Sequence, residues 1–295
     1  MYLHEDPNVL SQSIKAASNV LGLSEGYVLK DYYAVTMLRE VTQRNSDLVF
    51  KGGTCLSKCY GVIHRFSEDV DLGIPYEHAT ESMRKRIKRA VVESAEQLGL
   101  EIPNLDETRS RREYNRYEIA LPETDDMLLF ETAVMTPASP YRERPIQTFI
   151  GQFASEHDRG EFVEQYGLEQ FTVKANSLDR TFVDKTFALC DYYLMGGHAI
   201  YRQSRHVYDL FKLLDHVRLD EKLLSLFSEV RSQREPSERC LSAKSGVDLA
   251  ALLGEIALKD VYRSDYVNVT TPLLYEDVPY ESAMTSIHRI EEFLA

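Results

Sequence analysis

The chain has 295 residues, of which 43% are hydrophobic and 27% are charged, and its formal net charge is −13. This length and composition allow one large globular domain or two smaller ones, each with a real core. The acidic balance argues against a protein that coats nucleic acid nonspecifically, because such binding needs many cationic contacts with phosphate.

Neither a membrane span nor a secretion signal is apparent. No stretch approaches the roughly 18 apolar residues that a transmembrane helix needs. The first six residues lack the basic and then apolar pattern of a signal peptide. We therefore expect a cytoplasmic protein with no membrane partner. Its four cysteines are scattered, and only Cys55 and Cys59 share a helical face, so packing is their expected role.

The first predicted elements are helices between residues 8 and 43, whose apolar positions form a buried stripe. Lys30 and Asp31 lie within this segment, either as a surface ion pair or as residues that help to line a site. Leu48 to Phe50 then read as a short buried strand.

Two glycines, Gly52 and Gly53, end this strand. Without Cβ atoms they allow a tight turn and the close approach of a ligand. A helix is predicted from Thr54 to Tyr60, and the free N–H groups at its start favour an anion such as a phosphate. Adding the side-chain donors of the first turns, the candidate phosphate-binding residues are Gly52, Gly53, Thr54, Ser57 and Lys58.

An Asp-x-Asp motif follows on an apolar strand that begins near residue 69. Alternation along the strand places Asp69 and Asp71 on one face, beside the glycine turn. Two carboxylates that close repel each other unless a cation lies between them. The motif therefore predicts a metal site.

Two groups of basic residues come next. A helix predicted over residues 80–99 carries the first group, and the second group precedes a predicted strand. The first group, named the helix cluster, is Arg84, Lys85, Arg86, Lys88 and Arg89; the second, named the strand cluster, is Arg109, Arg111, Arg112 and Arg116. Such clusters are typical either of contact with RNA or of an ordinary solvated surface.

Glu131 is the candidate third carboxylate. Strands are predicted over residues 114–121 and 127–135, and Glu131 stands in the second among apolar neighbours. A carboxylate in such a strand is costly unless it is paired, hydrogen-bonded or bound to metal. The alternative is a glutamate on a solvent-facing strand edge.

The second half of the chain is predicted to be mainly helical from residue 181. Residues 136–180 read as an irregular connection with strands at 147–153 and 171–173. A polar loop is expected over residues 231–246, before last helices at 247–261 and 280–294. We therefore divide the chain into residues 1–145, with N-terminal helices and the core that contains the glycine turn and the Asp-x-Asp motif, and residues 146–295, with the connecting segment and a helical lobe.

Lys185 and Asp209, on two of the predicted helices, are further candidate residues. The ammonium group of a lysine suits phosphate oxygens, and an aspartate can hold a lysine in place. A structural ion pair would look the same in the sequence. Arg205 and His206 lie beside Asp209 and are candidates for contact with phosphate or with an acceptor, or for the surface of a helix.

Together these motifs resemble the signature of the polymerase-beta nucleotidyltransferase superfamily, in which a glycine turn precedes Asp-x-Asp on the next strand. Within it, three segments are similar to the AbiEii/AbiGii-type toxins, including the MenT-like ones. They are Phe-Lys-Gly-Gly-Thr-Cys-Leu-Ser-Lys from residue 50, Ser-Glu-Asp-Val-Asp-Leu from residue 67, and Arg-His-Val-Tyr-Asp-Leu from residue 205. The family also has a lysine that follows a glutamate on one helix, and an aspartate in the third segment; Lys185 and Asp209 hold these positions here, while Asp184 stands where the glutamate is common.

The resemblance implies an α/β (α+β) fold, in which a nucleotidyltransferase core with a mixed sheet precedes a helical C-terminal lobe and the active site lies between them. It implies Mg²⁺-dependent transfer of a nucleoside monophosphate from an NTP to RNA, most simply the 3′ end of a tRNA, which blocks translation. A cognate antitoxin, acting with or without contact, and a role in phage defence are also implied. The alternatives are a transferase for a protein side chain or small molecule, and a catalytically silent binding module.

The implied catalytic residues are Asp69, Asp71, Glu131, Lys185 and Asp209. Asp69 and Asp71 would hold two Mg²⁺ ions about 3.5–4 Å apart, with Glu131 either as a further metal ligand or as the proton acceptor. Lys185 would bind the triphosphate, and Asp209 would orient it. In some relatives the serine before the Asp-x-Asp is phosphorylated, a regulatory position that Ser67 holds here.

Overall fold

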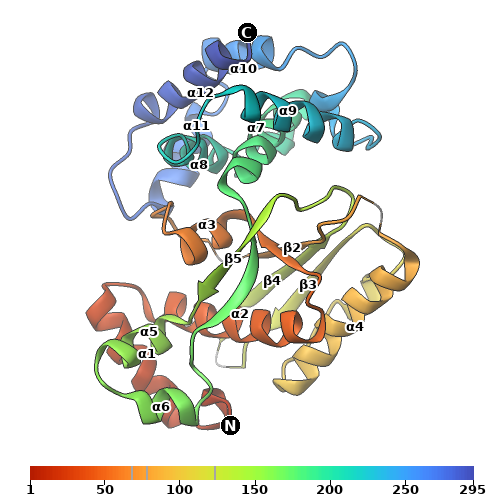
Figure 1. Ribbon diagram of the computed structural model, residues 1–295. Coiled ribbons are helices and arrows are strands. Elements are labelled where there is room, and N and C mark those ends of the chain that lie inside the picture. The colour runs from red at the N-terminus through yellow and green to blue at the C-terminus, as the bar shows by residue number, and fades with distance from the viewer. Residues whose placement is uncertain (68, 78, 123) are drawn as a thin grey trace.

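A six-stranded mixed sheet organises the N-terminal part of the chain in the computed structural model, which describes residues 1–67, 69–77, 79–122 and 124–295 (Figure 1). The strands lie in the order β3-β4-β2-β1-β6-β5. β1 is parallel to β6 and β2 to β4, and the other neighbours are antiparallel. This arrangement confirms the mixed α/β fold. The strands are β1 (Val49–Lys51), β2 (Val70–Gly73), β3 (Tyr114–Ala120), β4 (Met127–Ala133), β5 (Tyr141–Ile146) and β6 (Phe171–Asn176).

Helices cover one face of this sheet. Phe50, Leu72 and Phe130 point to that face and join one hydrophobic core with residues of α2 and α4. Because side chains alternate along a strand, their neighbours Lys51, Asp71 and Glu131 point to the opposite face. The helices of this part are α1 (Pro7–Leu21), α2 (Glu25–Arg44), α3 (Gly52–Tyr60), α4 (Glu81–Gln97), α5 (Phe149–Glu156) and α6 (Gly160–Gln165).

The C-terminal part is a helical layer above the sheet in Figure 1. Its core is a second hydrophobic cluster, to which α3 contributes Leu56 while Cys55 and Cys59 face the first cluster. α3 therefore lies between the two cores and joins them. The helices are α7 (Leu178–Met195), α8 (Arg205–Leu213), α9 (Glu221–Arg234), α10 (Leu249–Leu258), α11 (Arg263–Asp265) and α12 (Tyr280–Leu294).

None of the helices in the described part of the chain is both long and apolar enough to cross a membrane.

Two predicted elements are wrong. The strand expected at 147–153 is the helix α5, because the Thr148 side chain accepts a hydrogen bond from the Gly151 N–H at 2.9 Å and so caps a helix start. The loop expected at 231–246 begins later, since α9 continues to Arg234. Residues of α5, α6 and β6 join the first hydrophobic core. The division of the chain at residue 145 stays a prediction.

Candidate active site

A cavity of about 290 Å³ lies between α7, α8 and α9 and the face of the sheet that carries Lys51, Asp71 and Glu131. This face is called the open face. Residues from both parts of the chain line it, and most of them are polar or charged. They include Lys51, Gly52, Gly53, Arg65, Ser67, Asp69, Asp71, Glu131, Asp184, Lys185, Tyr192, Gln203, Arg205, His206 and Arg234.

Among the described residues, three of the carboxylates that line this cavity, Asp69, Asp71 and Glu131, come from the sheet or the residue just before it, and the fourth, Asp184, comes from α7. Asp71 and Glu131 are register partners on the neighbouring parallel strands β2 and β4, and Asp69 directly precedes β2. Burial and repulsion from Asp71 raise the pKa of Glu131 to about 7, although the Tyr114 hydroxyl donates a hydrogen bond to Glu131 Oε1 at 2.8 Å. The carboxylates therefore crowd one another, and a cation between them would relieve the repulsion.

The same carboxylates have the chemistry of a Mg²⁺ site, since Mg²⁺ prefers oxygen ligands. Within the described residues, however, no three His, Cys, Asp or Glu side chains are close enough together to hold a metal ion. Instead, Arg205 Nη1 lies 3.8 Å from Asp69 Oδ2. Metal binding by Asp69, Asp71 and Glu131 stays a prediction, and it requires these side chains to draw closer.

The glycine turn, Gly52 and Gly53, packs directly against Asp71 of β2 and the residues before this strand. Gly52 has a positive φ of 79°, and a Cβ placed on it would lie 1.9 Å from Asp71 Oδ2. A Cβ on Gly53 would lie 2.7 Å from both Arg65 Nη2 and Ser67 Oγ. A larger residue at either position would displace the groups that line the cavity.

Thr54 and Ser57 stand behind this turn, and the structure does not place either among the described residues that line the cavity. The Thr54 hydroxyl donates to the Asp69 carbonyl at 2.6 Å and to Ser67 Oγ at 3.0 Å, so Thr54 fixes the start of β2. Ser57 donates to the Thr54 carbonyl at 3.1 Å, within its own helix.

Lys58 requires a correction. Its ammonium group pairs with Asp31 Oδ1 at 2.6 Å and lies 3.6 Å from the centre of the Phe149 ring, with both charged side chains nearly fully buried. Lys58, Lys30 and Asp31 are absent from the described residues around the cavity. We therefore reassign Lys58 from phosphate binding to an ion pair that joins α3 to α2.

Asp209 lies fully buried between two cations. Lys185 Nζ is 2.6 Å from Asp209 Oδ2, and Arg65 donates from Nε and Nη2 to the two carboxylate oxygens at 2.7 and 2.8 Å. Burial alone would raise the Asp209 pKa, but the two cations outweigh it and hold that pKa far below its usual range. Asp209 thus orients Lys185, which lines the cavity.

Arg65, which also lines the cavity, was not predicted from the sequence as a site residue. A single arginine between the apolar pair Val62-Ile63 and Phe66 is the signal that was present, because a cation in such surroundings needs a buried partner. Its partner is 144 residues further along the chain, which local patterns do not show.

The family model described as "Nucleotidyl transferase AbiEii toxin, Type IV TA system" matches residues 37–295. The chain belongs to the AbiEii family. Among solved structures, it is similar to MenT4, a nucleotidyltransferase toxin from Mycobacterium tuberculosis H37Rv, with a TM-score of 0.52 and 18% identity over 96% of this chain and 89% of that one. No curated protein matches the chain.

In this AbiEii chain, α9 adds a cation to the cavity that the sequence reading also missed. Arg234 Nη2 lies 2.8 Å from Asp191 Oδ2, and Arg234 Nη1 lies 3.7 Å from Asp184 Oδ1. Asp184 in turn pairs with Arg180 at 3.0 Å. The aspartate that departs from the family pattern is therefore part of a buried network of charges.

Proposed function

We propose that this AbiEii-family protein transfers a nucleoside monophosphate from an NTP to RNA, most simply the 3′ end of a tRNA, and thereby blocks translation in the cytoplasm. One observation supports this best: three carboxylates and a lysine that a buried aspartate holds line one cavity, beside a glycine turn. Carboxylates and cations that line the same cavity suit a metal-bound triphosphate.

In the proposed reaction, Lys185 and the N–H groups of the Gly52–Gly53 turn hold the triphosphate, while Asp209 holds Lys185. The acceptor hydroxyl oxygen attacks the α-phosphorus, the bond from that phosphorus to the bridging oxygen breaks, and pyrophosphate leaves. Glu131 either takes the hydroxyl proton or ligates metal. Mg²⁺ bound by Asp69, Asp71 and Glu131 would neutralise charge on the phosphates.

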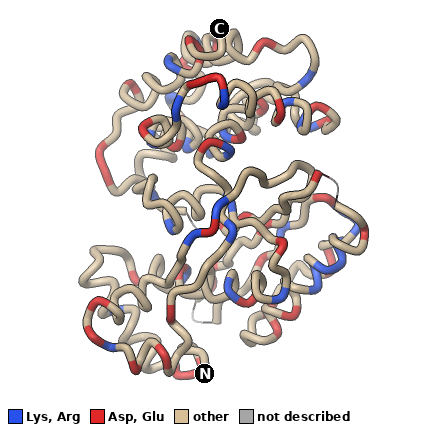
Figure 2. Tube along the Cα trace, in the orientation of Figure 1, with Lys and Arg blue, Asp and Glu red and all other residues tan. Residues whose placement is uncertain are grey.

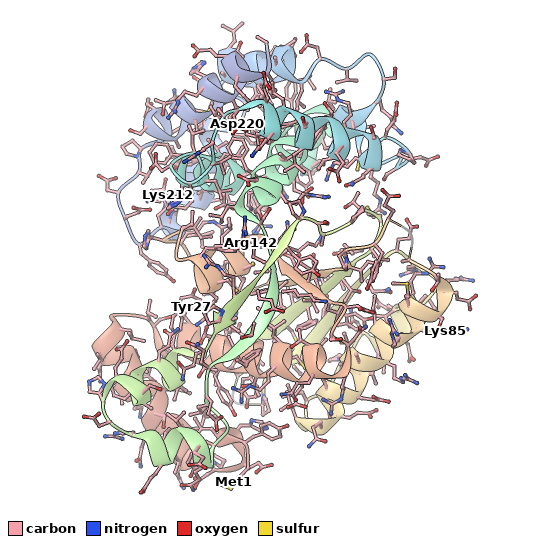
Figure 3. The ribbon with its side chains drawn as sticks, in the orientation of Figure 1. Met1, Tyr27, Lys85, Arg142, Lys212 and Asp220 are labelled. Carbon is pink, nitrogen blue, oxygen red and sulfur yellow. The ribbon has the colours of Figure 1, made fainter. Side chains whose placement is uncertain are left out.

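The strand cluster supports an RNA acceptor better than the helix cluster does. Arg116 is the register partner of Glu131 and is 47% exposed, so it lies on the open face of the sheet next to the cavity. The helix cluster lies on α4, which packs on the other face. Figure 2 shows blue segments along α4, and Figure 3 shows Lys85 pointing outward from it, away from the junction of the two parts.

Ser67 is the proposed regulatory position. Its hydroxyl lines the cavity and accepts a hydrogen bond from Thr54. A phosphate on Ser67 would add negative charge beside Asp69 and Asp71 and would occupy space that the substrate needs. An antitoxin that controls this protein, whether or not it binds directly, belongs to the same proposal.

Asp69→Asn tests the carboxylate site. The change keeps the size of the side chain but removes the charge that the reaction needs, so transfer of label from radioactive NTP should fall by about two orders of magnitude or more, with nearly unchanged melting temperature. The exposed Asp106→Asn is the matched control and should keep full transfer. Full transfer by the Asp69 variant would refute the role of this carboxylate.

A further inference from the structure

Four residues that line the cavity, named the wall here, are not used by the proposed phosphoryl chemistry. Tyr192 on α7 and His206 on α8 present nearly parallel rings, with an angle of 9° between the planes and 6.0 Å between the centroids. Ala188, one helical turn before Tyr192, and Gln203 complete this wall. A flat ring flanked by hydrogen-bonding groups fits a planar ligand.

The wall is held rigidly. Asp265 accepts hydrogen bonds from the backbone N–H groups of Arg202 at 2.8 Å and Ser204 at 2.9 Å, so it fixes the loop on both sides of Gln203. The Gln203 side-chain amide nitrogen donates to the Tyr201 carbonyl at 3.4 Å. That contact orients the amide and leaves its oxygen, Oε1, as the open group.

Two polar atoms of this wall need a partner. Among the residues that the structure describes, Gln203 Oε1 and His206 Nδ1 are buried and have no hydrogen-bond partner. Burial and the nearby cations Lys185 and Arg205 hold the pKa of His206 well below its usual range, so the ring is neutral and keeps an acceptor nitrogen. A buried acceptor such as Gln203 Oε1 is costly unless water or a ligand donates to it.

We propose that Tyr192, Gln203 and His206 bind the nucleobase of the NTP and select bases that carry an exocyclic amino group. This inference rests on the proposed nucleotidyl transfer. The base stacks on Tyr192, and its amino group donates to Gln203 Oε1. A base with a keto oxygen at that position would bring two acceptors together, or would require the Gln203 amide to turn over and lose its bond to the Tyr201 carbonyl, so the site disfavours it.

Two pairs of nucleotides isolate this contact, because each pair exchanges an amino group for a keto oxygen: CTP with UTP, and ATP with ITP. For the wild-type protein, kcat/KM should favour the amino member by about tenfold or more in the pair whose ring size the cavity accepts. Gln203→Leu should reduce that ratio to about threefold or less, with most of the loss on the amino member. Tyr192→Leu should weaken binding of both members alike.

Matched controls are Gln12→Leu, on the exposed side of α1, and Tyr193→Leu, whose hydroxyl bonds to Glu255 outside the cavity. Both should keep the wild-type ratios and binding. A Gln203→Leu ratio equal to that of the wild type, or a wild type that prefers the keto member, overturns base selection while transfer itself stands. If the wild type binds and transfers none of these nucleotides, base selection falls. The proposed function falls with it if GTP is not transferred either.

Discussion

At the scale of single residues, substitutions at Asp209 and Lys185 should separate an effect on stability from an effect on function. Asp209→Asn would leave Arg65 and Lys185 buried without their counter-charge, and such a loss costs about 3–5 kcal/mol. Lys185→Ala keeps the two hydrogen bonds from Arg65 to Asp209, so it should cost less. Urea unfolding of both variants should therefore show the larger loss of stability for Asp209→Asn.

NTP binding by the Lys185→Ala variant, measured by nucleotide titration, tests the functional role of Lys185. Lys185→Ala should weaken NTP binding and transfer together, because the proposed triphosphate contact is gone while the fold remains. Unchanged titration and turnover would return Lys185 to a structural role.

The sequence alone led to a wrong prediction for Lys58, as a phosphate-binding residue, and to no prediction for Arg65. Both are cations near the glycine turn, but which one reaches the cavity depends on partners far away in the sequence. Lys58 is held by Asp31 of α2, and Arg65 is held by Asp209 of α8. The Lys185–Asp209 pair, by contrast, was expected from its resemblance to the family motif, and the two side chains lie 2.6 Å apart.

At the scale of elements, the unit of β1, α3 and β2 supplies the glycine turn and Asp71 to the cavity. Its secondary structure was predictable because the sequence signals for it are local. Two glycines, a helix start and alternating carboxylates each have a short-range physical cause. Where signals were ambiguous the prediction failed: the apolar run at 147–153 suits a strand or a helix, and the cap at Thr148 decides for the helix.

Two glycines of this unit allow a paired test. Gly52 and Gly61 both have positive φ, 79° and 62°, so alanine at either should cost roughly 1–2 kcal/mol of stability. At Gly61 nothing lies within 4 Å of an added Cβ, whereas at Gly52 the added atom meets Asp71. Gly52→Ala should therefore nearly abolish transfer at a temperature where Gly61→Ala remains active. Equal transfer by the two folded variants would contradict the packing of Asp71 against the turn.

At the scale of the whole molecule, the net charge of −13 is compatible with local clusters of basic residues. The sequence identified both basic clusters but not the faces that carry them, since the face depends on how α4 packs under the sheet. The structure places Arg116 of the strand cluster on the face of Glu131, and α4 on the opposite face. A local basic track beside the cavity is compatible with an acidic surface elsewhere.

Labelling of RNA tests the central claim most directly. Purified protein is incubated with deproteinised total RNA and each of the four labelled NTPs in turn. We predict labelled RNA of tRNA size with at least one NTP, and labelling that falls as salt rises. Arg112→Glu with Arg116→Glu should lower labelling much more than NTP binding, whereas the control pair Lys85→Glu with Arg89→Glu on α4 should change it little. RNA that stays unlabelled with all four NTPs, while a protein or small molecule takes up the label, would contradict the account.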